Sequence, residues 1–283
     1  MTVRIVTDST ADLPAALAQD MGIVVVPLNV HFDDEVFTDG VTIQSDEFYQ
    51  RLVSSSNLPK TSQPAIGAFM ETYQQLLTDA DGIVSVHVSS QVSGTVNAAQ
   101  LAVSELGSDA IEVVDTLQAS LALGLIAMAA AKVARNGGSL AQVVAEAKSA
   151  SQRARFFGLV ETLEYLEKGG RIGKAQALLG SLLRIKPILT LREGIAHPVE
   201  KVRTRAKGLE RLAAITAAMA PLEAIGVMSS DVAEDARLIV DALSQHIHEP
   251  EPVVSRFGPV LGTYLGPGSL GVAMLRAKGP DEQ

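Results

Sequence analysis

The fold class follows from Ile83-Val-Ser-Val-His-Val88, the segment Val92–Leu106 and Ile111-Glu-Val-Val114. The first and third runs are short and rich in β-branched residues, as buried strands are, and the segment between them has the length and apolar content of a helix. A strand, a helix and a second strand in this order predict a βαβ unit with parallel strands. The alternation continues on both sides, so we expect an α/β fold with a mostly parallel sheet in the first half.

The rest of the first half repeats this pattern. Expected strands cover 3–7 and 24–32. Pro27 in the second run indicates a sheet edge or a bend, because proline lacks the N–H that a central strand needs. Pro14 opens a helix at its first position, with Asp12 or Leu13 as the cap. The expected helices are 14–20, 45–54, 64–77, 92–106, 116–135 and 139–149.

The pattern changes after about residue 150. Glu161-Thr-Leu-Glu-Tyr-Leu-Glu-Lys-Gly-Gly-Arg-Ile-Gly173 predicts a short amphipathic helix, a glycine stop and a second helix from about Gly173 to Leu183. Two apolar runs separated by Glu193-Gly194 predict a hairpin. We therefore expect a two-layer α/β domain with a mixed sheet, and place the boundary near residues 150–155. The expected strands are 156–160, 185–191, 196–202, 224–228, 253–257 and 270–275, and the further helices are 207–219 and 233–246.

The composition limits the class of protein. Of 283 residues, 47% are hydrophobic and the mean hydropathy is +0.23, so one large domain or two ordinary ones can bury a sizeable core. The absence of Cys excludes a disulfide framework, a thiol nucleophile and Cys-ligated metal. No secretory signal precedes the first strand, and the longest apolar run, 119–131, is shorter than the roughly 20 residues of a membrane span. We expect a cytoplasmic protein without an integral membrane segment.

The charge is unevenly distributed. Residues 148–211 carry 14 Lys or Arg and 6 Asp or Glu, a net charge of +8, whereas the whole chain has a net charge of −9 and a pI of about 5.1. An acidic chain without a helix-turn-helix pattern is not typical of a nucleic-acid-binding protein. The basic stretch instead predicts one face for a phosphate, a carboxylate or an acidic partner. A solvated basic surface without a role is the alternative.

Polar side chains gather in four loops next to predicted strand ends or helix starts. These loops are Thr7-Asp-Ser-Thr-Ala-Asp12, Thr61-Ser-Gln-Pro64, Ser89-Ser-Gln-Val-Ser-Gly-Thr95 and Gly262-Thr-Tyr-Leu-Gly-Pro-Gly268. Ligands of open parallel sheets collect at the carboxyl ends of the strands, so the loops are candidate binding segments. In the first two loops the hydroxyls could instead only cap helices and shape turns.

Within these loops we single out the residues able to hold an anion. Thr61 or Ser62 is a candidate N-cap, and a hydroxyl beside free helix N–H groups can also bind an anion. Ser93 offers a hydroxyl, and Gly94 lets the backbone approach a ligand. Tyr264, at the centre of its loop, can donate a hydrogen bond, or it can be a packed aromatic in a turn.

Arg171 is the candidate cation outside the loops. Glycines flank it, so the turn can hold its guanidinium over a ligand. An ordinary helix ending after Lys168 would give the same glycine pattern.

Several chemistries lack their motif. The loop at 89–95 contains neither G-x-x-x-x-G-K nor G-x-S-x-G, so a nucleotide cradle and a hydrolase nucleophile are unsupported. No pair among the five histidines has a metal-binding spacing, His246 and His248 lie at a predicted helix end, and no Ser-His-Asp triad can be assembled from the spacing. We expect no metal and no cofactor.

The segments above, taken together, resemble the DegV family of bacterial fatty-acid-binding proteins. They follow the expected order over nearly the whole chain. The resemblance rests on Asp8-Ser-Thr-Ala-Asp-Leu13, Thr61-Ser-Gln-Pro64, Ser93-Gly-Thr95, Glu161-Thr-Leu-Glu-Tyr-Leu166, Gly169-Gly-Arg-Ile-Gly173, Ile185-Lys-Pro-Ile188, Lys201-Val-Arg-Thr-Arg205 and Gly266-Pro-Gly268.

The resemblance implies a fold and a ligand. It implies a three-layer α/β/α domain over 1–153, a two-layer α/β domain over 154–283, and a long-chain fatty acid in the cleft between them. The fatty acid carboxylate would meet the hydroxyls of Thr61 and Ser93, with Ser62 and Gly94 beside them. Arg171 would lie near the head group, as would Tyr264.

The resemblance also implies a partner. Relatives present the fatty acid carboxylate to a separate ATP-dependent kinase subunit, which makes acyl-phosphate for phospholipid synthesis. In this chain Lys201, Arg203 and Arg205 would help to dock that kinase, and the chain alone would not be an enzyme.

One position departs from the family. Relatives commonly have His where this chain has Tyr264, and a tyrosine is neutral and a poorer proton carrier at pH 7. We expect the tyrosine to affect phosphoryl transfer more than ligand binding. The alternative function is a stand-alone enzyme or binder for a small carboxylated or phosphorylated metabolite, with Ser93 or Asp8 catalytic. A DNA-associated regulator is opposed by the acidic pI.

Overall fold

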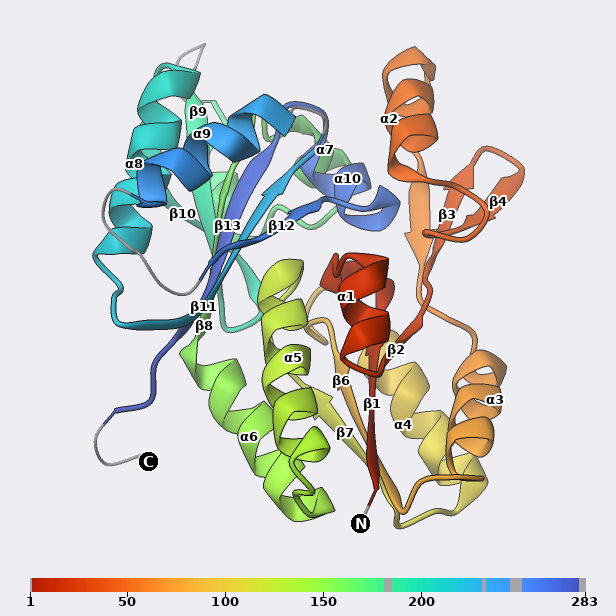
Figure 1. Ribbon diagram of the computed structural model, residues 1–283. Helices are drawn as coiled ribbons and strands as arrows, with labels where there is room; N and C mark the ends of the chain where they lie inside the picture. The colour runs from red at the N-terminus through yellow and green to blue at the C-terminus, as the bar shows by residue number, and fades with distance from the viewer. Residues whose placement is uncertain (1, 181–184, 231–232, 245–250, 280–283) are drawn as a thin grey trace.

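The computed structural model describes residues 2–180, 185–230, 233–244 and 251–279, which contain two large sheets and one small one (Figure 1). In this part of the chain the N-terminal sheet has four parallel strands in the order β2-β1-β6-β7. The predicted βαβ unit is present, since β6 and β7 are parallel neighbours with Ile83 opposite Ile111. The strands are β1 Val3–Asp8, β2 Ile23–Val26, β6 Gly82–His87 and β7 Ile111–Asp115.

Helices cover both faces of this sheet, which makes the three layers that the family resemblance implied (Figure 1). One face packs on α3 and α4, with Phe69 and Tyr73 buried against β-branched strand residues. The other face packs on α5 and α6. These helices are α1 Ala15–Asp20, α3 Ile66–Leu76, α4 Thr95–Leu106, α5 Leu121–Arg135 and α6 Leu140–Arg153.

The predicted strand 24–32 is wrong as a single strand. It is divided at Pro27-Leu28 into β2, an edge of the N-terminal sheet, and β3 Asn29–Phe32, the middle strand of a small antiparallel sheet. Pro27 thus marks a bend as well as an edge. The two partners of β3 were not predicted. They are β4 Glu35–Thr38 and β5 Lys60–Ser62, and with α2 Ser45–Ser54 they form the projection at the upper right of Figure 1.

In the described residues the C-terminal sheet has six strands in the order β10-β9-β8-β13-β11-β12. Only β11 and β12 pair in parallel among these neighbours, so the sheet is mixed, as predicted, and β9 and β10 form the predicted hairpin. The strands are β8 Ala154–Leu159, β9 Lys186–Arg192, β10 Ile195–Val202, β11 Leu222–Ser229, β12 Val253–Arg256 and β13 Leu270–Arg276.

One face of the C-terminal sheet is covered by α8 Arg205–Ala217 and α9 Ala233–Ser244. The opposite face packs on α5, which therefore lies between the two large sheets. Buried residues of α5 run from Leu121 to Ala131, and one continuous core joins them to both halves of the chain. The boundary that we placed between residues 153 and 154 falls where α6 ends and β8 begins.

Some predicted helix limits differ from the structure. The helix predicted from Thr116 begins only at Leu121, because Leu117 and Ser120 have positive φ angles of 53° and 55°, which a helix does not contain. The helix predicted from Gly173 is a 3₁₀ helix, η2 Gly173–Leu178, and residues 181–184 lie outside the described part. The residue before α1 is Pro14, without a side-chain cap, while Asp12 has a left-handed conformation after η1 Ser9–Ala11.

Two predictions near the C-terminus concern the loop around Tyr264 and the helix end at His246. The predicted loop around Tyr264 is mostly helical, because α10 spans Pro259–Leu265. Pro259 is its first residue, where a missing N–H has no effect on the helix. His246 and His248 lie outside the described residues, and so does the predicted helix end at residue 246.

A glycine-to-alanine change tests the packing of α5. Gly226→Ala on β11 should lower the free energy of unfolding by about 1–3 kcal/mol, because a methyl group there would overlap Leu121 Cδ2 and lie 2.8 Å from its Cγ. Urea denaturation measures this loss. The control is Gly67→Ala on α3, which meets no atom within 4 Å and should be neutral or stabilising. Equal midpoints for both variants and the wild type would contradict close packing at Gly226.

Candidate functional site

A cavity of about 930 Å³, including its open mouth, lies between the N-terminal and C-terminal sheets. On one side it is formed by segments after the carboxyl ends of β1, β6 and β7, where ligands of parallel sheets collect. On the other side it is formed by β8, β9, β10, α7 and α10. The apolar lining is Leu28, Val88, Val92, Ala119, Phe156, Leu166, Leu189, Leu191, Ala196, Val260, Leu261 and Leu265.

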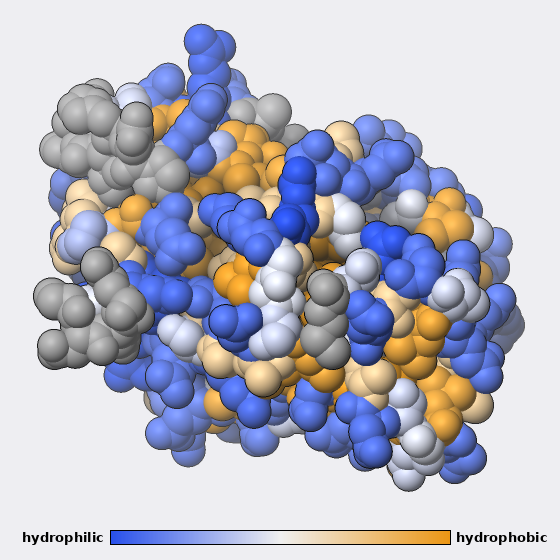
Figure 2. All heavy atoms as spheres, turned by 60° about the horizontal axis from the view of Figure 1, so that its bottom comes forward, coloured by the Kyte–Doolittle hydropathy of each residue, from blue (hydrophilic) through white to orange (hydrophobic). Residues whose placement is uncertain are grey.

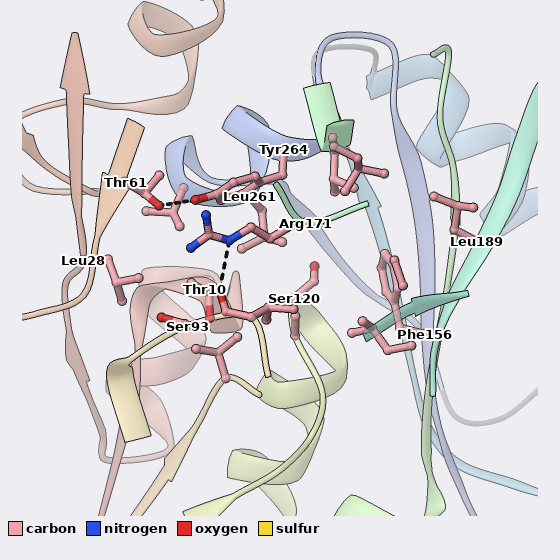
Figure 3. Close-up of a pocket in the computed structure, with 18 of the residues that line it drawn as sticks. Thr10, Leu28, Thr61, Ser93, Ser120, Phe156, Arg171, Leu189, Leu261 and Tyr264 are labelled. Carbon is pink, nitrogen blue, oxygen red and sulfur yellow. Dashed lines mark hydrogen bonds between the residues drawn. The ribbon is translucent and has the colours of Figure 1, made fainter. Parts of the chain in front are cut away.

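The four polar loops of the sequence analysis meet at this cavity. Thr10, Thr61, Ser93 and Tyr264 come one from each loop, and all line it. Arg171 and Gly94 line it as well (Figure 3). The carboxyl edge of the sheet, together with α10, brings these residues together from positions up to 254 residues apart in the chain.

Thr61, Tyr264 and Arg171 form the polar end of the cavity (Figure 3). The hydroxyl of Tyr264 lies 2.5 Å from Thr61 Oγ1. The Arg171 guanidinium lies 5.0 Å from the centre of the Tyr264 ring, within the range of a cation–π contact. Arg171 also donates from Nε to the Val92 carbonyl at 3.1 Å and from Nη1 to the Gly169 carbonyl at 2.9 Å. These bonds fix the guanidinium at the point where three segments meet.

The glycine after α7 Glu164–Lys168 has two structural roles. Gly169 is the C-cap of this helix, as an ordinary helix ending would be. A Cβ at this position would also lie 2.5 Å from Tyr264 Cδ1. The glycine therefore ends the helix and leaves room for the tyrosine ring beside Arg171.

Ser62 does not line the cavity. It lies on β5 next to Thr61, and successive strand side chains point to opposite faces. Its hydroxyl lies 2.9 Å from His31 Nε2. The predicted cap role of Thr61 or Ser62 is also wrong, because α3 begins at Ile66 after Ala65, without a side-chain cap.

Ser93 and Gly94 precede α4. The Ser93 hydroxyl lies 2.9 Å from Thr95 Oγ1. Gly94 is the N-cap residue of the helix, and a Cβ there would lie 2.9 Å from the amide group of Gln63. Gln63 lines the cavity and was not among the predicted residues.

Comparison with known proteins agrees with this fold and site. A sequence profile described as an uncharacterised protein of the DegV family matches residues 2–277. This chain belongs to the DegV family. It is 34% identical to Protein DegV of Bacillus subtilis over 277 residues, 96% of this chain and 98% of that protein. A DegV domain-containing protein of Streptomyces coelicolor is 42% identical over 279 residues, with 96% and 98% of the two chains covered.

Solved DegV structures have the same architecture. A DegV family protein from Thermus thermophilus, described as binding fatty acid, matches with a TM-score of 0.86 at 35% identity, over 97% of this chain and 99% of that chain. DegV from Bacillus subtilis, described as a fatty acid binding protein, matches with a TM-score of 0.87 at 34% identity, with the same coverage. The family and the fold class predicted from the sequence are confirmed.

Three hydroxyls in the cavity wall were not singled out as site residues. Thr10 donates to Asp8 Oδ1 at 2.5 Å, Ser120 to Asp12 Oδ2 at 2.6 Å and Thr190 to the Phe156 carbonyl at 2.7 Å. Each hydroxyl therefore donates its hydrogen to an acceptor of the protein. Only the oxygen lone pairs remain for a group in the cavity. Ser120 was missed because we extended a helix through it. The apolar lining was missed because such residues are indistinguishable from core in a sequence.

Asp8, proposed as catalytic in the alternative function, is fully buried below the cavity. It accepts hydrogen bonds from the backbone N–H groups of Thr10 and Val88 and lies 2.9 Å from His87 Nδ1. His87 Nε2 lies 2.7 Å from Ser85, which accepts from Tyr73. Burial raises the pKa of Tyr73, so its hydroxyl stays protonated and donates. Although Asp8, His87 and Ser85 lie in line, all three are buried and none lines this cavity.

The predicted docking residues differ in their surroundings. Lys201 is exposed on β10, and Arg203 is exposed in the turn after it. Arg205 starts α8 and donates to Asp235 at 2.6 Å and to Glu161 at 2.7 Å. The strand predicted over 196–202 ends at Val202 as expected, and Thr204 caps the helix that follows.

In the described ranges, no helix has both the length and the apolar content of a membrane span, and no three His, Asp or Glu side chains are grouped as metal ligands would be. On the face in Figure 2, hydrophilic and hydrophobic side chains are interspersed.

Replacing Asp8 tests its structural role. Asp8→Asn should lower the free energy of unfolding by about 1–3 kcal/mol, because an amide NH₂ group would face donors that now meet a carboxylate. Thermal or urea denaturation measures this loss, with the exposed Asp109→Asn as the matched control. A variant as stable as the wild type would show that the network does not depend on the carboxylate.

Proposed function

We propose that this chain binds a long-chain fatty acid in the cavity, with the carboxylate at the Thr61–Arg171–Tyr264 end. The supporting observation is the polarity of the lining: an apolar wall formed by both sheets ends in hydroxyls and one arginine. Burying an acyl chain gains roughly 0.8 kcal/mol per CH₂. About 14 methylenes would contribute on the order of 11 kcal/mol before ordering penalties, which leaves room for micromolar binding.

An ionised carboxylate in such a cavity needs hydrogen-bond donors. Thr61 and Tyr264 have two hydroxyl hydrogens, and their mutual hydrogen bond uses one. The second hydrogen is left for the ligand. Ser93 and Thr95 leave one hydrogen in the same way. Arg171 adds positive charge beside them, so the polar end can satisfy both carboxylate oxygens.

We further propose that the bound carboxylate is presented to a separate ATP-dependent kinase, which converts it to acyl-phosphate for phospholipid synthesis in the cytoplasm. The sequence contains no nucleotide cradle of its own. The exposed Lys201 and Arg203 suit an acidic partner surface. In this proposal residues 1–153 and 154–283 are two domains that enclose the ligand. The chain by itself is a binding subunit without enzymatic activity.

Organic extraction of the purified protein followed by mass spectrometry tests the ligand directly. We expect one long-chain fatty acid per chain, and its length and saturation identify the preference. An extract without lipid, together with failed titration by palmitate and oleate, would reject the fatty acid and favour a small carboxylated or phosphorylated metabolite.

Substitutions at the polar end should weaken fatty acid binding. Thr61→Val, Ser93→Ala and Tyr264→Phe each remove a donor and should each cost about 1–3 kcal/mol of binding free energy, measured by calorimetric titration with oleate. Ser62→Ala, on the opposite face of the same strand, is the control and should bind like the wild type. Unchanged affinity in all three variants would move the carboxylate elsewhere.

Charge reversal separates binding from kinase coupling. Arg203→Glu should leave oleate affinity unchanged and reduce ATP-dependent acyl-phosphate formation by a purified fatty acid kinase, because attraction to an acidic partner becomes repulsion. Lys132→Glu, an equal charge change at an exposed position of α5, should not affect the rate. Loss of oleate binding in Arg203→Glu would show a structural role for Arg203.

A further inference from the structure

Helix α10 connects the cavity to the rest of the molecule. Val260, Leu261, Tyr264 and Leu265 of this helix line the cavity. The helix packs against α2, β3, β5 and η1 of the first half and against α7 of the second. Glycines flank it at both ends, at Gly258 and Gly266. The helix therefore supplies part of the cavity wall next to the Thr61–Tyr264 pair.

Two buried carboxyls lie at the start of this helix. Asp12 Oδ1 accepts from the backbone N–H of Gly258 at 2.9 Å, and Asp39 lies beside the same glycine. Asp12 follows η1, and Asp39 follows β4. Their exposed fractions are 7% and 5%. The first half of the chain thus holds α10 through Asp12 and places a second carboxyl next to that bond.

The two carboxyls lie close to each other around Gly258. A methyl group at Gly258 would lie 3.2 Å from Asp12 Oδ1 and 3.4 Å from Asp39 Oδ1. Within the described residues, Asp39 Oδ2 has no hydrogen-bond partner. Two charges here would repel each other, and one of the oxygens would be desolvated without compensation.

Asp12 is also bonded to the cavity wall. Its Oδ2 accepts from Ser120, which lines the cavity. Ser120 has φ 55° and ψ −152°, and Asp12 has φ 51°, both unusual for residues other than glycine. Such conformations persist only where the surroundings impose them. One carboxyl therefore joins a strained position of the wall to the helix that closes it.

We propose that Asp12 and Asp39 form a latch that positions α10 over the cavity, and that opening of this latch speeds fatty acid uptake and release. The proposal rests on the proposed function for its ligand. It assigns a positioning role to two residues that lie outside the cavity.

The latch makes opening dependent on pH. Burial raises the pKa of Asp12 well above its usual value, and burial raises the pKa of Asp39 to about 7. The charged groups that face them are each other, Asp8 from β1 and Arg256 from β12. Arg256 is itself bonded to Asp46 and to the Ser230 carbonyl, so its charge is shared. A second cavity lined by Asp12, Asp39 and Arg256 gives water a path to the carboxyls.

The direction of the effect follows from proton linkage. The closed state keeps Asp39 protonated up to about pH 7, whereas a solvated carboxyl ionises near pH 4. The closed state therefore binds more protons, and raising the pH from about 4 to about 7 favours the open state. Above about pH 7 Asp39 is ionised in both states, and its contribution becomes constant.

The experiment measures release of a bound fluorescent fatty acid into excess oleate between pH 5.5 and 8. For the wild type we expect the release rate to rise more than about fivefold up to pH 7 and then to flatten, since one group contributes at most about tenfold per pH unit. Asp39→Asn keeps an acceptor without a titrating charge, so release should be slow and should rise less with pH than in the wild type, because Asp12 alone still titrates in the latch. The exposed Asp34→Asn on the same hairpin should behave like the wild type.

The wild-type profile alone can overturn the proposal. A release rate that is constant over this range excludes the latch, even if Asp39→Asn does not fold. A pH profile in Asp39→Asn equal to that of the wild type shows that Asp39 does not contribute to the pH dependence and also excludes the latch. Normal oleate affinity in either case leaves the proposed function standing.

A measurement without ligand tests the latch if no fatty acid binds. Because the chain contains no Cys, Val260→Cys introduces a single thiol at a buried position of α10. Its alkylation rate, divided by that of free glutathione at each pH, reports opening. We expect this ratio to rise up to about pH 7 and to rise less in the Asp39→Asn background. A constant ratio would reject the latch independently of any lipid.

Discussion

The burial of α5 between the two large sheets is the constraint on which the rest of the structure depends. Its residues from Leu121 to Ala131 are buried against β1 on one side and against β8, β11 and β13 on the other. Glycine at Gly226 lets β11 approach Leu121 closely. A single core therefore spans both halves, so the distance between the sheets is fixed by side-chain packing.

The cavity exists because this packing ends where α5 begins. Ala119 and Ser120, just before the helix, are part of the cavity wall. Beyond them, residues after the carboxyl ends of β1, β6 and β7 line the cavity together with β8, β9 and α10. The polar groups are separated accordingly. Thr61, Arg171 and Tyr264 lie at one end, while wall hydroxyls such as Thr190 are bonded inward and leave the lining compatible with an acyl chain.

Much of the fold could be predicted because local sequence patterns encode it. The βαβ unit at 82–115, the hairpin of β9 and β10, and α2 at Ser45–Ser54 were all expected from periodicity and turn residues. The failures have tertiary causes. Leu117 and Ser120 adopt positive φ for tertiary reasons, so the helix started later than its apolar residues indicated. Strands β4 and β5 are short and form only because β3 lies between them.

The sequence by itself determined the family, the parallel and mixed sheets, and the loops that carry Thr61, Ser93, Gly94, Arg171 and Tyr264, since these depend on residue type and spacing. Only the tertiary structure decided which of their side chains face the cavity. Strand alternation turned Ser62 toward His31, ion pairs engaged Arg205, and burial left Asp8 without access. The apolar wall and the Asp12–Asp39 pair join residues far apart in the chain, and their proximity arises from packing, which no local pattern encodes.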